Sequence, residues 1–114
     1  MEVKKVIIKK IKEREKIVKN LKKIIKEISK EVKKLLGKDA KVYVFGSYLK
    51  GNFHPFLSDV DVLIVSNKIK SLDDKVKVSL SLKEKFRYIF QFYVVNEKEF
   101  KIYKFFVDKI KEIK

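Results

Sequence analysis

A glycine turn followed by two aspartates constrains the fold of this chain more than any other stretch. Residues 44–51 read VFGSYLKG, which is typical of a strand end, a tight glycine turn and a short helical start. Six residues later, residues 58–65 read SDVDVLIV, with two acids at the start of an apolar strand. A strand, turn and strand in this order can hold a polyphosphate and a divalent cation side by side.

The residue types of the glycine turn suit phosphate binding. Gly46 permits a sharp turn and a close approach of a ligand to the backbone. Ser47 is a natural N-cap with a hydroxyl donor, and the amides of residues 48–50 are expected to face outward. The candidate nucleotide-binding residues are Gly46, Ser47, Lys50 and Gly51, with Ser58 at the entry to the acidic pair. The pattern is also common as plain structure, so the turn alone does not establish a phosphate site.

Asp59 and Asp61 are the candidate metal-binding and catalytic residues. Residues two apart in a strand share a face, so both carboxylates can reach one hard cation. Mg²⁺, or Mn²⁺ in its place, takes such oxygens together with phosphate oxygens and water. Two like charges at the mouth of an apolar strand repel each other unless a cation lies between them. The alternative is that both acids only cap loops, but their place beside the glycine turn favours the metal site.

The N-terminal third of the chain predicts a long amphipathic helix. Apolar residues recur at steps of three and four across residues 1–37, and Gly37 stands where a helix C-cap is expected. Arg14 takes the one expected apolar position of this stripe that is polar. Such a stripe either covers a sheet within the domain or forms the seam with a partner helix, and an overhanging helix would do both.

The remaining elements differ in how clearly the residues define them. Beyond the strand–turn–strand unit at residues 41–65, a third strand is predicted at 88–95 and a C-terminal helix at 97–113. Between the second and third strands, residues 76–82 alternate as a strand does. Ser71 with the acids after it indicates a helix start instead. The residues alone leave both possibilities open for this segment.

The composition adds a strong positive charge. Thirty Lys and Arg against 15 Asp and Glu give a formal charge of +15. This favours anionic partners such as nucleotides or nucleic acid, but the lysines are spread along the chain, which also fits the Lys-rich surfaces of thermophile proteins. There is no cysteine and no apolar run of membrane-spanning length. A single cytoplasmic domain over residues 1–114 is expected.

With these residues in view, the chain resembles the nucleotidyltransferase superfamily of the DNA polymerase β type. The resemblance rests on Gly-Ser-x-x-x-Gly at residues 46–51, Ser-Asp-x-Asp at residues 58–61 and an apolar strand on either side. The short chain is similar to the minimal nucleotidyltransferases of archaea and bacteria. The resemblance implies an α/β (α+β) fold, a small mixed sheet flanked by helices, with a helix over residues 72–85. The roles it implies are triphosphate binding for Gly46 and Ser47, and Mg²⁺ binding for Asp59 and Asp61.

The chain departs from the family pattern at the third carboxylate. Active members of that family carry a further acid on the next central strand, whereas residues 88–95 read YIFQFYVV. Gln91 is the expected occupant of that position because it is the one polar residue there besides the tyrosines. Its amide can ligate weakly, but it carries no charge and is no general base. Slow transfer and nucleotide binding without transfer are both compatible with this sequence.

The resemblance also implies a partner. Many minimal members pair with a small helical protein of the kind called HEPN, as antitoxin and toxin, and in some pairs they place AMP on it. The apolar residues of the first and last helices exceed what one sheet covers, which fits such a partner or a homo-oligomer. We therefore expect a Mg²⁺-dependent transferase that moves a nucleoside monophosphate, AMP from ATP, to a protein acceptor. The alternatives are a catalytically impaired nucleotide-binding or antitoxin scaffold and a basic nucleic-acid-binding module.

Overall fold

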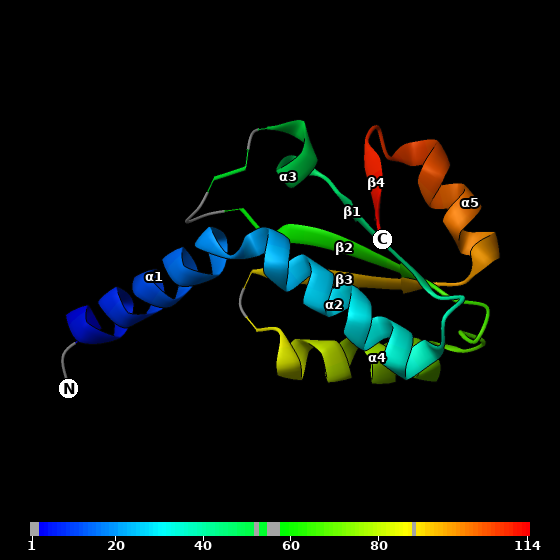
Figure 1. Cartoon of the computed structure of the whole chain (residues 1–114), viewed down its shortest axis with the longest axis horizontal. Coiled ribbons are helices and arrows are strands. Elements are labelled where there is room, and N and C mark those ends of the chain that lie inside the picture. Colours follow the sequence, from blue (N-terminus) through cyan, green and yellow to red (C-terminus); the bar gives the residue numbers. More distant parts are fainter. Residues whose placement is uncertain (1–2, 52, 55–57, 88) are drawn as a thin grey trace.

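The computed structural model describes residues 3–51, 53–54, 58–87 and 89–114. Within them the elements follow in the order α1 (Val3–Lys19), α2 (Leu21–Leu36), β1 (Lys41–Phe45), α3 (Ser47–Lys50), β2 (Val60–Val65), α4 (Leu72–Lys85), β3 (Phe90–Val95), α5 (Glu97–Phe106) and β4 (Ile110–Ile113). Figure 1 shows α2 and α4 along the sheet, with α1 projecting from one end. None of the helices in the described residues is long and apolar enough to cross a membrane.

The four strands form one mixed sheet in the order β3-β2-β1-β4. β1 pairs antiparallel with both β2 and β4, and β2 pairs in parallel with β3. The predicted small mixed sheet flanked by helices is confirmed. β3 begins at Phe90, whereas the third strand was predicted from Tyr88, which lies outside the described residues. Residues 52 and 55–57 of the predicted strand–turn–strand unit also lie outside them.

Alternate residues of the strands face two separate cores, because successive side chains of a strand point to opposite faces. The larger core lies under α2 and α4. Its strand residues are Val42, Val44, Val60, Val62, Ile64, Phe90, Phe92 and Val94. The smaller core lies on the other face, under Phe100 of α5. Asp61 and Gln91 belong to this second face, and Gln91 is exposed there. The candidate site therefore lies on the face that α5 covers only in part.

The N-terminal helix predicted over residues 1–37 is two helices rather than one. The break is at Asn20, whose backbone (φ −108°, ψ 19°) leaves the helical region and whose side-chain amide donates to the Lys16 carbonyl 2.9 Å away. Asparagine bonds of this kind compete with helical hydrogen bonding. The buried residues of α2 are Leu21, Ile25, Ile28, Ser29, Val32 and Leu36, whereas no residue of α1 is buried. α1 projects from the sheet (Figure 1), and its residues Ile7 and Ile11 remain 51% and 41% exposed.

The segment that the residues alone left open is a helix. α4 forms over Leu72–Lys85, as the family resemblance implied, although residues 76–82 alternate as a strand does. The Ser71 hydroxyl accepts the Asp74 amide 3.2 Å away, and Asp73 and Asp74 lie in the first turn, where acids stabilise a helix. Because β2 and β3 are parallel, the chain must cross the sheet between them, and a helix is the usual crossover.

The prediction of a helix over residues 97–113 is wrong beyond Phe106. α5 begins with a capping box formed by Asn96 and Glu99. The chain then turns, and Ile110–Ile113 pairs with β1 as β4. Without β4, the outer edge of β1 would expose unpaired backbone groups. Pairing with an existing strand therefore outweighs the helical spacing of the apolar residues in this tail.

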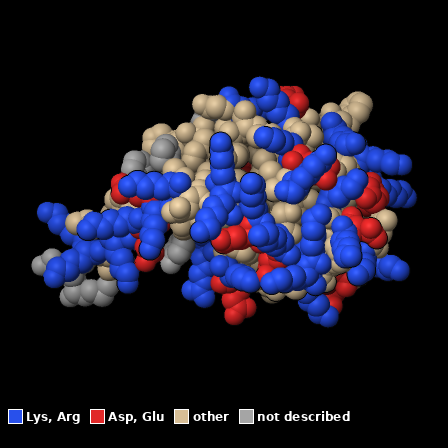
Figure 2. Space-filling view, in the orientation of Figure 1, with Lys and Arg blue, Asp and Glu red and all other residues tan. Residues whose placement is uncertain are grey.

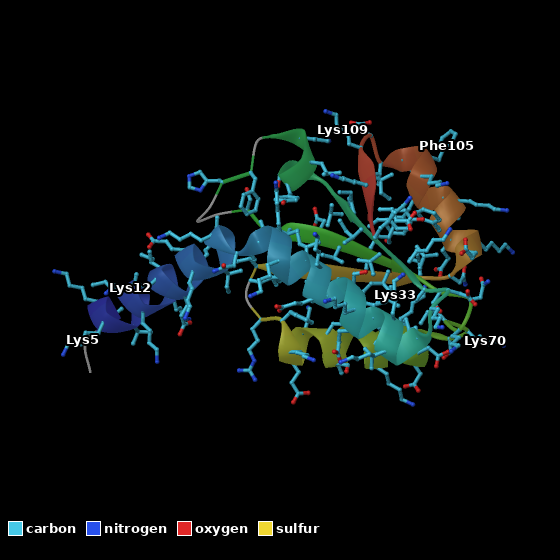
Figure 3. All side chains as sticks on the ribbon, in the orientation of Figure 1. Lys5, Lys12, Lys33, Lys70, Phe105 and Lys109 are labelled. Atoms are coloured by element: carbon cyan, nitrogen blue, oxygen red, sulfur yellow. The ribbon has the colours of Figure 1, made fainter. Side chains whose placement is uncertain are left out.

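Basic side chains are spread over the surface rather than gathered on one element. Figure 2 shows Lys and Arg across the face that α1 and α2 present, with acidic side chains between them. The lysines labelled in Figure 3 point outward from separate places: Lys5 and Lys12 on α1, Lys33 on α2, Lys70 before α4 and Lys109 before β4. This face carries a general positive charge rather than a single basic track of the kind that follows a nucleic-acid backbone.

Candidate functional site

Strand pairing brings the glycine turn and the aspartates together. β1 and β2 are antiparallel, so the end of β1 lies beside the start of β2, and Phe45 pairs with Asp61. β2 and β3 are parallel, which places Gln91 beside Asp61 on the other side. Residues far apart in sequence thus meet at one end of the sheet, where the turn after β1 begins.

Gly46 makes the closest approach in this site. Its φ of 79° and ψ of −151° lie in a region that is essentially restricted to glycine. A Cβ atom at this position would lie 2.4 Å from Oδ2 of Asp61. Glycine is therefore required twice, by the backbone conformation and by the space beside the carboxylate.

The short helix after the turn is capped differently from the prediction. Gly46, not Ser47, is the N-cap residue of α3, and Ser47 is its first helical residue. The amides of Leu49 and Lys50 donate to the Gly46 carbonyl at 3.1 and 3.2 Å. These two amides close the turn, so the expectation that they face outward toward a ligand is wrong. Gly51 ends α3 in the left-handed conformation (φ 79°, ψ 4°), as a C-cap does.

Two other predicted nucleotide-binding residues make contacts within the protein. Lys50 Nζ lies 3.5 Å from Oδ2 of Asp108, an exposed ion pair between α3 and the loop before β4. The Ser58 hydroxyl accepts the His54 amide at 2.9 Å, and the Ser58 amide donates to the His54 carbonyl at 2.9 Å. Ser58 is thus bonded to His54 through both its hydroxyl and its amide. Nucleotide contacts of these residues, and of the turn itself, stay predictions.

Asp59 and Asp61 interact with each other, and each has a neutral neighbour on β3. Gln91 Nε2 lies 3.4 Å from Asp59 Oδ2, and the Tyr93 hydroxyl lies 3.5 Å from Asp61 Oδ1. Burial raises the pKa of Asp61, the hydrogen bond from Tyr93 lowers it, and the negative charge of Asp59 raises it further, with a net upward shift. Burial and the charge of Asp61 also raise the pKa of Tyr93. A cation beside the two carboxylates would relieve this excess of negative charge.

Arg14 and Tyr93 reach the site although neither is among its predicted residues. Arg14 Nη2 donates to the Ser58 carbonyl, and Nη1 lies 3.9 Å from Oδ1 of Asp59. The sequence did carry a signal for Arg14, since it interrupts an otherwise apolar helical stripe. For Tyr93 the signal was its position two residues after Gln91, which puts both side chains on one face of β3.

The donor set fits one hard divalent cation. The carboxylate oxygens of Asp59 and Asp61 are the ligands that Mg²⁺ and Mn²⁺ take. Among the described residues, no group of three or more His, Cys, Asp or Glu side chains converges to hold a metal ion. Gln91 lies beside the pair and offers an amide rather than a third carboxylate, so two carboxylates are available to a cation here. These residues suit a cation that also takes phosphate oxygens from a ligand, rather than one held by the protein alone.

Replacing Asp61 by asparagine is expected to stabilise the protein in the absence of divalent cations. Because the folded-state pKa of Asp61 is raised, the unfolded chain loses this proton first, and stability falls as the pH rises from about 3.9 through the folded-state pKa. At neutral pH the full penalty is present. Asp61→Asn should remove it and raise Tm by roughly 2–5 °C, equivalent to ~0.5–1 kcal/mol after solvent screening.

Thermal melts in EDTA at pH 7 and pH 3 test this expectation. The gain from Asp61→Asn should shrink at pH 3, where the wild-type carboxyl is protonated in both states. Asp39→Asn, which neutralises an exposed acid in the turn before β1, serves as the control and should leave Tm unchanged. A lower Tm for Asp61→Asn at pH 7 would contradict the expectation that the ionised carboxylate of Asp61 destabilises the folded protein.

Comparisons with known proteins match this chain to a family profile and to solved structures of similar fold. The family profile described as "Nucleotidyltransferase domain" matches residues 25–114. A crystal structure described as that of a "putative nucleotidyltransferase" is 32% identical, with a TM-score of 0.63, and the match covers 83% of this chain and 99% of the other. A second, from Sulfolobus solfataricus and with the same description, is 27% identical, with a TM-score of 0.60 over 80% of this chain and 77% of the other. Among curated proteins, none matches the sequence significantly. α1 lies outside the range that the family profile matches.

Proposed function

This chain belongs to the nucleotidyltransferase domain family, and we propose that it transfers a nucleoside monophosphate from a triphosphate to a protein acceptor, with AMP from ATP as the first case to test. The observation behind this proposal is the contact at Gly46, where the turn after β1 is held against a β2 carboxylate with no room for a side chain. A turn this close to Asp61 can hold a triphosphate against a cation that the aspartates bind. Nucleotidyl transfer is the activity of the family; the base and the acceptor are the proposal.

Each residue of the site would have its own role in this reaction. Asp59 and Asp61 would hold Mg²⁺ or Mn²⁺, which when bound neutralises the triphosphate and lowers the pKa of the attacking hydroxyl. The turn at Gly46 and Ser47 would hold the triphosphate, and the Tyr93 hydroxyl would orient Asp61 through the bond it makes now. The acceptor oxygen bonds to the α-phosphorus, its proton passes to solvent, and pyrophosphate leaves with the electrons of the broken bond.

The acceptor we propose is a small helical partner protein of the HEPN kind, with this chain as the antitoxin of the pair. The support is apolar surface on α5, where Ile102, Phe105 and Phe106 are 58%, 84% and 76% exposed. Figure 3 shows Phe105 pointing away from the sheet. Clustered exposed apolar side chains mark contact surfaces. A second copy of this chain is the competing occupant, and the mass of the protein alone in solution separates the two.

Gln91 favours a second candidate function, a nucleotide-binding or antitoxin scaffold without turnover. The side chain beside Asp59 and Asp61 is the uncharged amide of Gln91, which we expect to stand where the family resemblance implies an acid. A site with two carboxylates binds a cation less tightly than one with three and offers no further base. Binding of nucleotide without covalent transfer is the result that this candidate predicts.

Calorimetric titration of ATP and the other triphosphates, with Mg²⁺ and with EDTA, tests the site. We expect binding that needs Mg²⁺ and is lost in Asp59→Ala/Asp61→Ala. No binding of any triphosphate to the folded protein would contradict both the transferase and the nucleotide-binding scaffold. RNA binding that is steeply salt-dependent and survives the double variant would instead favour the nucleic-acid module.

A transfer assay separates the enzyme from the scaffold. Triphosphate labelled at the α-phosphate is incubated with the protein and a purified HEPN-type partner, and both label in protein and released pyrophosphate are counted. Equal amounts of both, absent in Asp59→Ala/Asp61→Ala, would establish transfer. Binding without label or pyrophosphate would assign the scaffold function.

A further inference from the structure

Arg14 connects a helix outside the family-matched range to the candidate metal site. The family profile begins at residue 25, and α1 ends at Lys19. α1 projects from the sheet, yet the Arg14 side chain is only 18% exposed because it folds back onto the segment that enters β2. Its Nη2 donates to the Ser58 carbonyl, and its Nη1 lies 3.9 Å from Asp59 Oδ1.

The contact between Arg14 and Asp59 makes the net charge of the site less negative. Asp59 and Asp61 bring two negative charges, Gln91 adds none, and Arg14 adds one positive charge, so these four side chains sum to −1. A divalent cation is attracted by the carboxylates and repelled by a guanidinium held a few ångströms away.

We infer that Arg14 is a resident cation of the site, which competes with the divalent cation for Asp59 and lowers its affinity in the absence of nucleotide. The inference deepens the proposed function and rests on the assignment of Asp59 and Asp61 as metal ligands. With Arg14 in place the protein binds the cation weakly by itself, and the negative charge of a bound triphosphate compensates for the guanidinium. Metal and nucleotide then bind together rather than in sequence.

A purely structural role for Arg14 makes a different prediction. The bond to the Ser58 carbonyl would anchor α1 to the loop before β2, and the distance to Asp59 would carry no consequence. Removing the charge would then change stability and leave metal affinity where it is. The two roles are therefore distinguished by cation binding, not by stability or activity.

Titration of Mn²⁺ into the protein without nucleotide, with free Mn²⁺ counted by electron paramagnetic resonance, provides the test. Arg14→Gln removes the charge and keeps an amide donor on a shorter side chain. It is expected to bind Mn²⁺ about five- to tenfold more tightly than wild type, the change expected on removing one charge that lies 3.9 Å from Asp59 Oδ1, with solvent screening. Arg14→Lys keeps the charge and should bind as wild type does. Arg87→Gln is the matched control, because Arg87 is exposed, donates to the Glu84 carbonyl and lies on another loop.

The outcomes separate cleanly. A gain in Arg14→Gln alone supports the inference. Equal or weaker Mn²⁺ binding in Arg14→Gln, or an equal gain in Arg87→Gln, overturns it, as does no binding to any variant. Thermal melts confirm that each variant is folded. A gain in Arg14→Gln with no triphosphate binding to any variant would leave this inference standing while the proposed function fails.

Discussion

Replacing Gly46 by alanine should abolish Mg²⁺-dependent triphosphate binding and destabilise the protein by about 2–4 kcal/mol, through backbone strain and overpacking together. The new Cβ would lie 2.4 Å from Asp61 Oδ2, so either the carboxylate or the turn must move. The backbone cannot relax easily, because its φ of 79° and ψ of −151° suit glycine alone. Movement of either group separates the turn from the carboxylate that the proposed site needs.

Gly51 offers a matched control for this substitution. It has the same φ of 79°, but its ψ of 4° is in the left-handed region. Among the described residues other than its chain neighbours, no atom lies within 4 Å of an added Cβ. Gly51→Ala should cost about 1 kcal/mol and leave triphosphate binding close to wild type. Urea unfolding and calorimetric titration of ATP with Mg²⁺ measure both quantities for the two variants.

A double-mutant cycle isolates the contact with the carboxylate. In an Asp61→Ala background the Cβ at Gly46 no longer meets Oδ2, so Gly46→Ala should cost less there than in wild type. An equal cost in both backgrounds would assign the whole effect to the backbone. Wild-type triphosphate binding by Gly46→Ala would remove the contact as the basis of the proposed site.

The candidate site was readable from sequence because its signals are local. A glycine directly after a strand indicates a turn with a positive φ, and two acids two residues apart in a strand share one face. Both signals involve only a few consecutive residues. The sequence could not show which atoms the turn approaches. That depends on the pairing of Phe45 with Asp61 across two strands, and only the folded sheet reveals that Gly46 is fitted against the carboxylate.

The sheet decided one segment that the residues left open and overruled the helix predicted for another. Residues 76–82 alternate as a strand does, yet the parallel pairing of β2 with β3 requires a crossover, and α4 supplies it. Residues 110–113 continue a helical spacing, yet they form β4 because β1 has an edge to pair. Short apolar runs satisfy both periods, so local pattern alone does not distinguish them.

The contacts of Arg14 could not be predicted from local sequence patterns. Its polar side chain in an apolar stripe was visible, but its partners Ser58 and Asp59 follow more than forty residues later. The break at Asn20, which sets the direction of α1, was not visible as a break, because asparagine is tolerated in many helices. The contact of Arg14 with Ser58 and Asp59 depends both on the arginine in the apolar stripe and on the helix break at Asn20.

Replacing Gln91 by glutamate is expected to tighten Mn²⁺ binding about tenfold, a gain typical of one negative charge added beside two carboxylates with solvent screening. Glutamate has the length of glutamine, so the new carboxylate should take the place of the amide that now lies 3.4 Å from Asp59 Oδ2. Three carboxylates would then lie at the site, the set that the family resemblance implies for active members. The change is one of charge rather than of shape.

The same substitution should make stability depend on the cation. In EDTA, three negative charges at one end of the sheet repel, and Tm should fall below that of wild type by a shift equivalent to roughly 1 kcal/mol. In excess Mn²⁺ the order should reverse, because the variant binds the cation more tightly and ligand binding to the folded state stabilises it. Gln91→Asn adds no charge and should show neither effect.

Transfer activity in this variant decides between the two candidate functions. If the wild type binds triphosphate without transfer and Gln91→Glu transfers label to the partner with release of pyrophosphate, the missing acid is what limits the natural chain. If both transfer label, two carboxylates suffice, and Gln91 tunes the rate rather than abolishing it. Unchanged Mn²⁺ affinity in Gln91→Glu would show that residue 91 does not face the bound cation, and the third-carboxylate assignment would then be wrong.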